Sequence, residues 1–369
     1  MLESVSRAAA GTAASMRCPF CAIDVHTHVV PGRFPAYLGG KGAASWPSME
    51  QADSCRRHVM IGGKIYRTVS DRAWDGALRL SDMDEQSVGA QVLSPMPELL
   101  SYWLDPTDAA RLLRFINEEI AAMVAAYPGR FFGLGAVPLQ DIGAAIDELH
   151  HIVGTLGLSG VEIAGSVNGA PIGGERFAPF WAAVAELDAA VFVHPLRPTG
   201  LDRVVGPKQL QQLLAFPSET GLAAASLLTG GVLDRHPKLR IAFSHGGGTL
   251  SALLPRLQHG WTAIPEVRES MRIAPLEAAR RFYVDSLLYD ERAIAVAIAL
   301  FGETQVLLGS DYPFRIRDRD PVGRIEAMSL GEPLRSRLFW KNACRWLGVP
   351  EEEAATPVLA ADSGPGSSG

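Results

Sequence analysis

The segment CAIDVHTHVVPG, residues 21–32, ends a short apolar run with two histidines that are separated by a single residue. On a β-strand, side chains two positions apart point to the same side, so His26 and His28 are expected to project together from the strand end. Two neutral imidazoles held side by side make half of a metal site. The segment therefore predicts a buried strand that carries part of a metal centre.

Seven further apolar runs follow this strand. They occupy residues 89–95, 131–139, 159–165, 189–195, 239–247, 281–287 and 304–314. Amphipathic helical segments such as DAARLLRFINEEIAAMVAAYP lie between them, beginning near Asp or Pro and ending near Gly or Pro. Apolar strands alternating with helices indicate a parallel sheet covered by helices, and eight such units predict an α/β fold, a (β/α)8 TIM-like barrel.

One stretch interrupts this alternation. Residues 33–74 are rich in Gly, Ser and charge, and VMIGGKIYRTV within them is typical of a hairpin that turns at its Gly-Gly pair. We expect a small inserted hairpin subdomain after strand one, over the barrel mouth. Because both chain ends contain few large apolar residues, we expect a flexible leader over residues 1–20, the barrel over 21–350 and a disordered tail over 351–369.

Composition limits the class of protein. With 369 residues, 47% of them hydrophobic, the chain can bury a large core. A net charge of -6 without Lys/Arg clusters argues against nucleic-acid and membrane-surface binding. Four scattered cysteines and the lack of a signal-like apolar run in the first twenty residues favour the cytoplasm. The CPFC at residues 18–21 lacks a second ligand pair, so we interpret it as ordinary reduced thiols.

Five polar residues fall at the ends of expected strands. His26 and His28 end strand one, His194 strand five, His245 strand six and Asp311 strand eight. Barrel enzymes build their active sites at the carboxyl ends of the strands. Three histidines and a carboxylate, completed by water, provide a mixed nitrogen and oxygen ligand set that suits zinc or a similar divalent ion and leaves a position open for chemistry.

Each of these residues also has an ordinary structural explanation. A single histidine near a strand end is more often a core or loop residue than a ligand. Asp311, in GSDYPF, fits a turn or a helix cap equally well. The occurrence of all five on four different strands favours a functional site.

Four motifs occur in order along the chain: DVHTH, FVHP, FSHGGG and LLGSDYPF. They resemble the amidohydrolase superfamily, a set of metal-dependent enzymes on TIM-like barrels. Longer segments include GALRLSDMDEQSVGAQVLSP, AVPLQD, FPSETGLAAASLLTGGVLDRHPKLRIAFSHGGG and RFYVDSL. These are similar to the aminocarboxymuconate semialdehyde decarboxylase branch, whose members mostly release carboxylate as carbon dioxide without an organic cofactor. The resemblance runs from about Ala22 to Val349 and implies a carboxy-lyase acting on a small unsaturated or aromatic acid.

The resemblance also implies roles for the polar residues. His26, His28, His194 and Asp311 would bind one divalent ion, with Zn²⁺ preferred and Mn²⁺ as the alternative. His245 would be the catalytic acid/base beside the metal, and Asp311 counts among the catalytic residues as well. Such a division is compatible with general acid/base chemistry, because His245 remains free for proton transfer.

Three basic residues are candidates for substrate binding. By resemblance, Arg67 in the hairpin contacts a substrate carboxylate, and Arg256 reaches into the neighbouring subunit's site in a homodimer. Lys64 lies near the same hairpin and is a weaker candidate. An arginine fork suits a carboxylate because it forms two charge-assisted hydrogen bonds. A solvated hairpin arginine and a surface helix charge remain alternatives for Arg67 and Arg256.

The chain departs from the family at two places. Strand four, SGVEIAG, contains no lysine to bridge two metals, so we expect one metal ion. After strand five, Leu196 and Arg197 stand where the branch's decarboxylase has a tryptophan following its HP, which changes the pocket wall. The reaction class is therefore better supported than the identity of the substrate.

Other functions are compatible with the same site. A related metal-dependent hydrolase or hydratase would act on a lactone, an amide or an unsaturated acid. A non-catalytic binding protein that keeps the barrel is a further alternative, which a complete ligand set disfavours. The exact substrate, the pathway and the native metal do not follow from the sequence.

Overall fold

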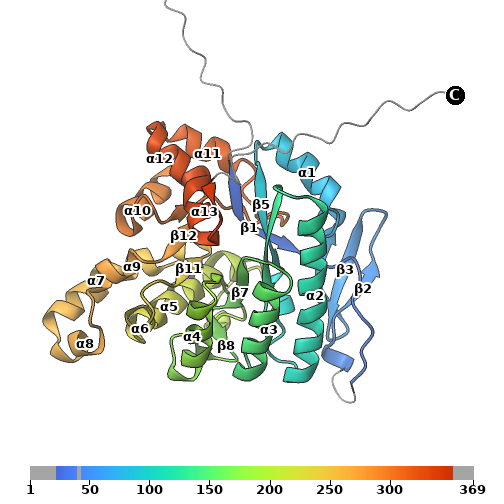
Figure 1. The fold of residues 1–369 in the computed structure, drawn as a ribbon, viewed down its shortest axis with the longest axis horizontal. Helices are drawn as coiled ribbons and strands as arrows, with labels where there is room; N and C mark the ends of the chain where they lie inside the picture. Colours follow the sequence, from blue (N-terminus) through green and yellow to red (C-terminus); the bar gives the residue numbers. More distant parts are fainter. Residues whose placement is uncertain (1–21, 40–42, 352–369) are drawn as a thin grey trace, which may run out of the picture.

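A computed structural model describes residues 22–39 and 43–351 of the chain (Figure 1). The predicted leader, the CPFC segment and nearly all of the predicted tail lie outside the described residues. Eight strands form one parallel sheet in the order β1-β5-β6-β7-β10-β11-β12-β13. Their bounds are β1 Ile23–Val29, β5 Ala90–Pro95, β6 Phe131–Ala136, β7 Gly160–Ala164, β10 Ala190–His194, β11 Arg240–Phe243, β12 Tyr283–Asp285 and β13 Val306–Leu307.

The sheet closes between its first and last strands. The backbone N–H of Val25 donates to the carbonyl of Leu308 at 2.9 Å, and Thr27 forms a parallel bridge with Tyr312. All eight strands lie where the apolar runs predicted them, and the predicted (β/α)8 barrel is confirmed. Strand pairing in a closed barrel leaves no free edge, and it brings the carboxyl ends of all eight strands to one mouth.

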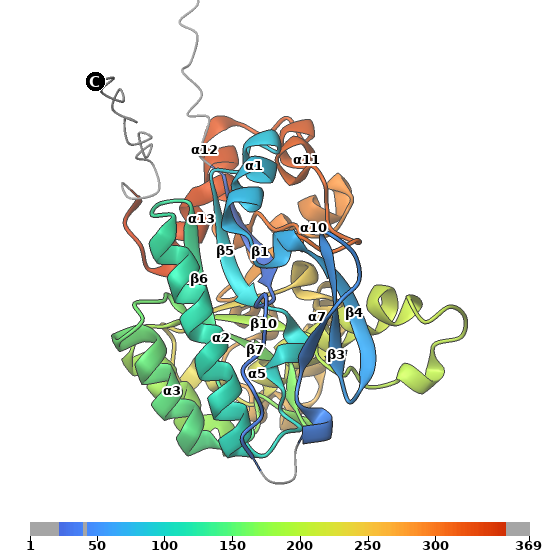
Figure 2. The same cartoon turned by 90° about the vertical axis from the view of Figure 1, so that its right-hand side faces the viewer.

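Helices cover the outside of the barrel (Figures 1 and 2). The bounds are α1 Gly76–Glu85, α2 Pro106–Ala126, α3 Ile142–Gly154, α4 Ala178–Glu186, α5 Phe216–Thr229, α6 Val232–Arg235, α7 Leu250–Ala263, α8 Pro265–Ser270, α9 Pro275–Ala279, α10 Glu291–Phe301, α11 Pro321–Ala327, α12 Glu332–Ser336 and α13 Asn342–Leu347. Several begin at a capping aspartate, as the sequence predicted: the Asp75 carboxylate accepts hydrogen bonds from two N–H groups of α1. Within the described residues, no helix has the length and apolar character needed to cross a membrane.

The predicted insertion holds a three-stranded antiparallel sheet, which we call the lid. Its strands are β2 Ser48–Gln51, β3 Arg56–Ile61 and β4 Lys64–Ser70. The expected hairpin joins β3 to β4, and its Gly-Gly pair adopts positive φ angles of 63° and 69°. These angles fit a tight two-residue turn that glycine allows without steric conflict. The strand β2 was not predicted, because Ser48–Gln51 carries no apolar alternation.

The inside of the barrel is divided along its axis. At the amino ends of the strands, inward side chains such as Val25, Val92 and Phe192 form an apolar cluster with Trp346 of α13. Trp346 is fully buried, and its ring lies 6.0 Å from that of Phe192. The remaining core packs between the strands and the outer helices. The helix α13 therefore closes the amino end of the barrel with apolar side chains.

An irregularity in β1 redirects its side chains. Between Asp24 and Thr27 the pairing with β5 shifts register, so that one extra residue is accommodated in β1. Val25 belongs to the inner apolar cluster, and the next residue, His26, also faces the barrel interior with its ring 5.1 Å from Phe192. A β-bulge explains how neighbouring residues of one strand both reach the interior, because it interrupts the two-residue alternation.

Candidate metal centre

Four of the predicted residues meet at the carboxyl end of the barrel. His26 and His28 come from β1, His194 ends β10 and Asp311 follows β13. All four are buried, and one potential ligand atom from each lies within 4.8 Å of the others. We call this group the His-Asp cluster. Its members are separated by up to 285 positions in the sequence, and the barrel topology brings them together.

Hydrogen bonds to backbone carbonyls fix the orientation of two of the three rings. The Nδ1 atom of His28 lies 3.1 Å from the carbonyl oxygen of Pro95, and that of His194 lies 2.9 Å from the carbonyl oxygen of Pro195. Because a carbonyl oxygen only accepts, each Nδ1 donates, and the opposite Nε2 keeps its lone pair free. Fixing the tautomer through the second nitrogen in this way is common among metal-ligating histidines.

The distances within the cluster fit one bound ion. The Nε2 atoms of His26 and His28 are 3.1 Å apart, and Oδ1 of Asp311 lies 3.6 and 3.3 Å from them, respectively. Two ligands about 2.1 Å from a zinc ion and roughly 100° apart lie about 3.2 Å from each other. A group of acceptor atoms facing one another in a buried space suits a cation, so these residues fit the predicted metal.

The ionisable groups of the cluster alter one another's pKa values. Burial opposes protonation of His26, but the hydrogen bond and charge of Asp285 and the charge of Asp311 raise the pKa of His26 to about 9. Burial and the neighbouring His26 charge lower the pKa of His28, and burial holds the pKa of His194 well below its usual value. Without metal, a proton on Nε2 of His26 faces the lone pair of His28 at 3.1 Å. A metal ion would replace this proton.

His245 lies beside the cluster without belonging to it. It follows β11 in a loop of positive φ, at 56°, and its ring centroid lies 5.2 Å from that of His194. Its Nδ1 atom lies 3.0 Å from the hydroxyl of Ser244. Burial, followed by the charge of His26, lowers the pKa of His245 to about 4, so the ring is neutral at neutral pH. A neutral imidazole beside a metal centre can take up a proton.

Asp285, which the sequence reasoning missed, organises both histidines. Its Oδ2 lies 2.6 Å from Nδ1 of His26 and accepts the N–H of His245 at 3.0 Å, while Oδ1 accepts the N–H of Gly246 at 2.7 Å. One buried carboxylate therefore orients a predicted ligand and fixes the loop that carries the predicted acid/base. Its position at the carboxyl end of the seventh barrel strand was the available signal.

Glu162 on β7 was also missed. It is fully buried, with Oε2 3.7 Å from Nδ1 of His28. Burial raises its pKa to about 8, so this side chain is mostly protonated at neutral pH. It stands in SGVEIAG, the strand noted above for its lack of a bridging lysine.

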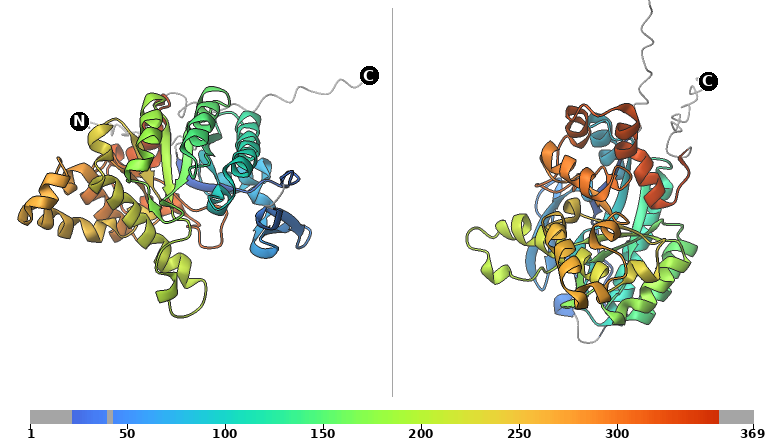
Figure 3. Two further views of the ribbon diagram at one scale, coloured as in Figure 1. Left: turned by 90° about the horizontal axis from the view of Figure 1, so that it is seen from below. Right: turned by 90° about the vertical axis from the view of Figure 1, so that its left-hand side faces the viewer.

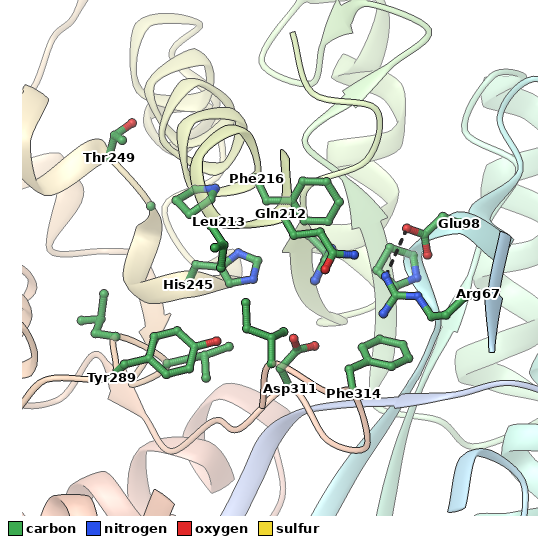
Figure 4. A pocket seen from close by; sticks show the side chains of 17 residues that line it. Arg67, Glu98, Gln212, Leu213, Phe216, His245, Thr249, Tyr289, Asp311 and Phe314 are labelled. Carbon is green, nitrogen blue, oxygen red and sulfur yellow. Dashed lines mark ion pairs between the residues drawn. The ribbon is translucent and has the colours of Figure 1, made fainter. Parts of the chain in front are cut away.

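A cavity of about 270 Å³ opens beside the cluster, and we call it the site cavity (Figure 4). His194, His245 and Asp311 form part of its lining. Phe216 and Phe314 supply aromatic surface, and Figure 4 shows Phe314 beside Arg67. The site cavity therefore combines flat apolar walls with a cation and an acid/base group, which suits a small planar carboxylic acid.

Arg67 reaches the site cavity from β4 of the lid. Its guanidinium carbon lies 4.1 Å from the ring centroid of Phe314, and one nitrogen lies 3.9 Å from Oε1 of Glu98. Glu98, a missed residue that follows β5, is buried and accepts a hydrogen bond from the Tyr66 hydroxyl. Its other oxygen has no hydrogen-bond partner among the described residues. This pair supplies one positive and one negative group to the lining of the site cavity.

The other two basic candidates lie away from the site cavity. Lys64 is exposed at the tip of the β3–β4 hairpin. Arg256 is exposed on α7, which projects with α8 on the side opposite the lid (Figure 3). Neither is among the residues that line the site cavity. Their contact with substrate stays a prediction, and for Arg256 it requires a second subunit.

Comparison with known proteins places the chain in a family. The amidohydrolase family model matches residues 23–349. A 2-amino-3-carboxymuconate-6-semialdehyde decarboxylase of Dictyostelium discoideum is 37% identical over 89% of this chain and 91% of its own length. A gamma-resorcylate decarboxylase of Rhodococcus jostii is 30% identical over 72% of this chain and 85% of its own length.

A solved structure gives the same result. A 2,6-dihydroxybenzoate decarboxylase in complex with 2,6-dihydroxybenzoate superposes with a TM-score of 0.68 and 27% identity, covering 76% of this chain and 90% of that one. The likeness covers most of both chains rather than a fragment. On the strength of the family match and the 37% identical relative, the chain belongs to the amidohydrolase family, in its aminocarboxymuconate semialdehyde decarboxylase-like branch.

Proposed function

We propose that this protein is a metal-dependent decarboxylase that removes a carboxylate from a small unsaturated or aromatic acid without an organic cofactor. One observation carries the proposal: the buried His-Asp cluster adjoins a cavity lined by His245 and Arg67, in a chain whose relatives are named decarboxylases. His26, His28, His194 and Asp311 would hold the ion, which would supply Lewis-acid stabilisation of developing negative charge.

The remaining residues have separate tasks. Arg67 binds a substrate carboxylate, and Phe314 and Phe216 provide apolar surface for the substrate. The C–C bond breaks so that its electron pair stays on the substrate carbon, while the carboxylate leaves as carbon dioxide. His245 acts as acid/base: its neutral imidazole takes up a proton from solvent and delivers it to that carbon. Asp285 keeps His245 in place through two backbone hydrogen bonds to its loop.

The proposed ion is Zn²⁺, with Mn²⁺ as the alternative. Three imidazoles and one carboxylate satisfy the preferences of zinc and are acceptable to manganese. Elemental analysis of the purified protein would identify the metal. Recovery of activity after chelation should then be greatest with the same ion.

A substrate panel tests the reaction. The metal-loaded protein is incubated with carboxylated muconates and hydroxybenzoates while carbon dioxide release and absorbance are recorded. A parallel panel of lactones, amides and unsaturated acids tests hydrolysis and hydration. Release of carbon dioxide in proportion to substrate loss is expected. Turnover of the second panel without carbon dioxide release would overturn the proposal.

We also propose a homodimer in which Arg256 enters the partner's site. Support comes from its exposed position on α7, which begins five residues after His245. The test mixes Arg256→Ala subunits with His245→Ala subunits. One site of the mixed dimer then carries both lesions and the other carries neither, so activity should return on mixing. No recovery despite proven subunit exchange would show that Arg256 does not act across the interface.

Location in the cytoplasm is a further part of the proposal. Cys55 is exposed and is a free thiol. Free thiols suit a reducing compartment. Fractionation of cells that produce the protein would test this assignment, and recovery outside the cytoplasm would overturn it.

A further inference from the structure

A second, larger cavity of about 1400 Å³ lies next to the site cavity, and we call it the vestibule. The lid forms one wall and residues 196–216 form another, a segment that projects from the barrel beside the lid (Figure 2). Arg67, Glu98 and Phe314 line both cavities. The vestibule is therefore continuous with the reaction site, and a ligand extending from the site cavity would enter it.

The lining of the vestibule is strongly basic. Seven of its residues are Arg or Lys and one, Glu98, is acidic, which gives the lining a formal net charge of +6. The whole chain has a net charge of -6. Positive charge is therefore concentrated around this cavity although the protein as a whole is acidic. Within the described part of the chain, five of the basic residues form no ion pair: Arg197, Lys208, Arg315, Arg317 and Arg319. Their charges are available to an anionic ligand.

Arg197 is the most specifically placed of these cations. Its guanidinium carbon lies 3.6 Å from the ring centroid of Trp103, which also lines the vestibule. Stacking on an indole face leaves the in-plane N–H groups free to bind a carboxylate. The residue adopts a positive φ of 49°, uncommon for a side chain of this size, directly after the buried Leu196. Local backbone geometry and ring stacking thus both position this arginine.

We propose that Arg197 anchors a second anion subsite in the vestibule, which selects substrates that carry an anionic group remote from the carboxylate lost at the metal centre. This inference rests on the proposed decarboxylase function and adds a substrate class to it. The preferred ligands are acids with two anionic groups at opposite ends. Arg67 serves the reacting end, and Arg197 serves the distant end.

Equilibrium binding to the metal-loaded protein tests the subsite. Straight-chain dicarboxylates of increasing length are compared by calorimetry with monocarboxylates of the same length. At short chain lengths, a dicarboxylate and the monocarboxylate of the same length should bind with the same affinity. Beyond the length that reaches Arg197, the dicarboxylate should gain on the order of tenfold in affinity, as expected for a partly solvated charge-assisted pair. High salt should reduce that gain.

Three variants complete the test. Arg197→Gln should abolish the length-dependent gain, and Arg197→Lys should keep part of it. Arg176→Gln is the matched control, because Arg176 is an exposed arginine stacked on Phe177 at 4.8 Å and lies outside both cavities. A gain that survives Arg197→Gln, or that Arg176→Gln also removes, would overturn the proposal. Since binding is measured without turnover, failure of the decarboxylase assignment would not be mistaken for failure of the subsite.

Discussion

The two ends of the barrel interior differ in chemistry although the same strands build both. At the amino end, Val25, Phe192 and Trp346 form a closed apolar plug. At the carboxyl end, His26 and His194 belong to the buried His-Asp cluster, the candidate metal centre. On β1 the change from plug to centre occurs between adjacent residues, and on β10 it occurs within two. The comparison indicates that the residues that stabilise the fold and those that perform chemistry are separated along the barrel axis. Substitutions at the amino end should therefore lower stability, and substitutions at the carboxyl end should lower metal content or activity.

Loss of a metal ligand should have the largest effect. His26→Ala removes one ligand and leaves Asp285 without its imidazole partner, so metal content and activity should fall together to background. Elemental analysis and an activity assay check this. His259→Ala, which changes an exposed histidine on α7, is the control and should keep both. A His26→Ala protein with a full complement of metal would contradict the assignment.

Loss of the acid/base should be the next largest effect and should separate the two functions of the carboxyl end. His245→Ala leaves all four cluster residues in place, so metal content should persist. Activity should fall by roughly 10²- to 10⁴-fold, the usual contribution of a general acid/base. If metal leaves together with activity, His245 is a ligand rather than the proton-transferring group.

A substitution in the plug should lower stability and leave metal binding unchanged. Trp346→Ala opens a cavity among fully buried apolar side chains and should lower the free energy of unfolding by about 3–5 kcal/mol. Metal bound per folded molecule should not change, because Phe192 lies between Trp346 and His26. Denaturant unfolding and elemental analysis measure the two quantities. Loss of metal without loss of stability would show that the ends are not separable.

The smallest expected effect is the release of one proton when the metal binds. The pKa of His26 is raised to about 9, above its usual 6.5, so the metal-free protein holds this proton at pH 7 and should release about one on binding zinc. Calorimetry in buffers of different ionisation enthalpy counts it. In the metal-free protein, the same shift stabilises the fold below about pH 6.5, and this contribution is lost as the pH rises through about 9. Asp285→Asn should reduce both effects, because Asp285 is the main source of the raised pKa.

The sequence predicted the barrel because each strand lies in a short, mainly apolar run, and such a run is a local property. It also located the four cluster residues and His245 at strand ends, since parallel strands bring those ends together. The bulge in β1 could not be predicted, because it depends on how β1 pairs with β5 across 66 positions. Asp285 and Glu98 were missed for a related reason: their importance lies in partners far away in the chain, at His26 and Arg67.

The apolar plug at the amino end also determines the side of the barrel from which substrate enters and product leaves. Trp346 and its neighbours fill the axis below the metal centre, and the described cavities lie above it, toward the lid. The substrate acid and its decarboxylated product would then both pass through the lid side of the barrel. A product that lingers in the vestibule would delay the next substrate, so competitive inhibition by the product is the expected kinetic consequence of a chamber that is closed at one end.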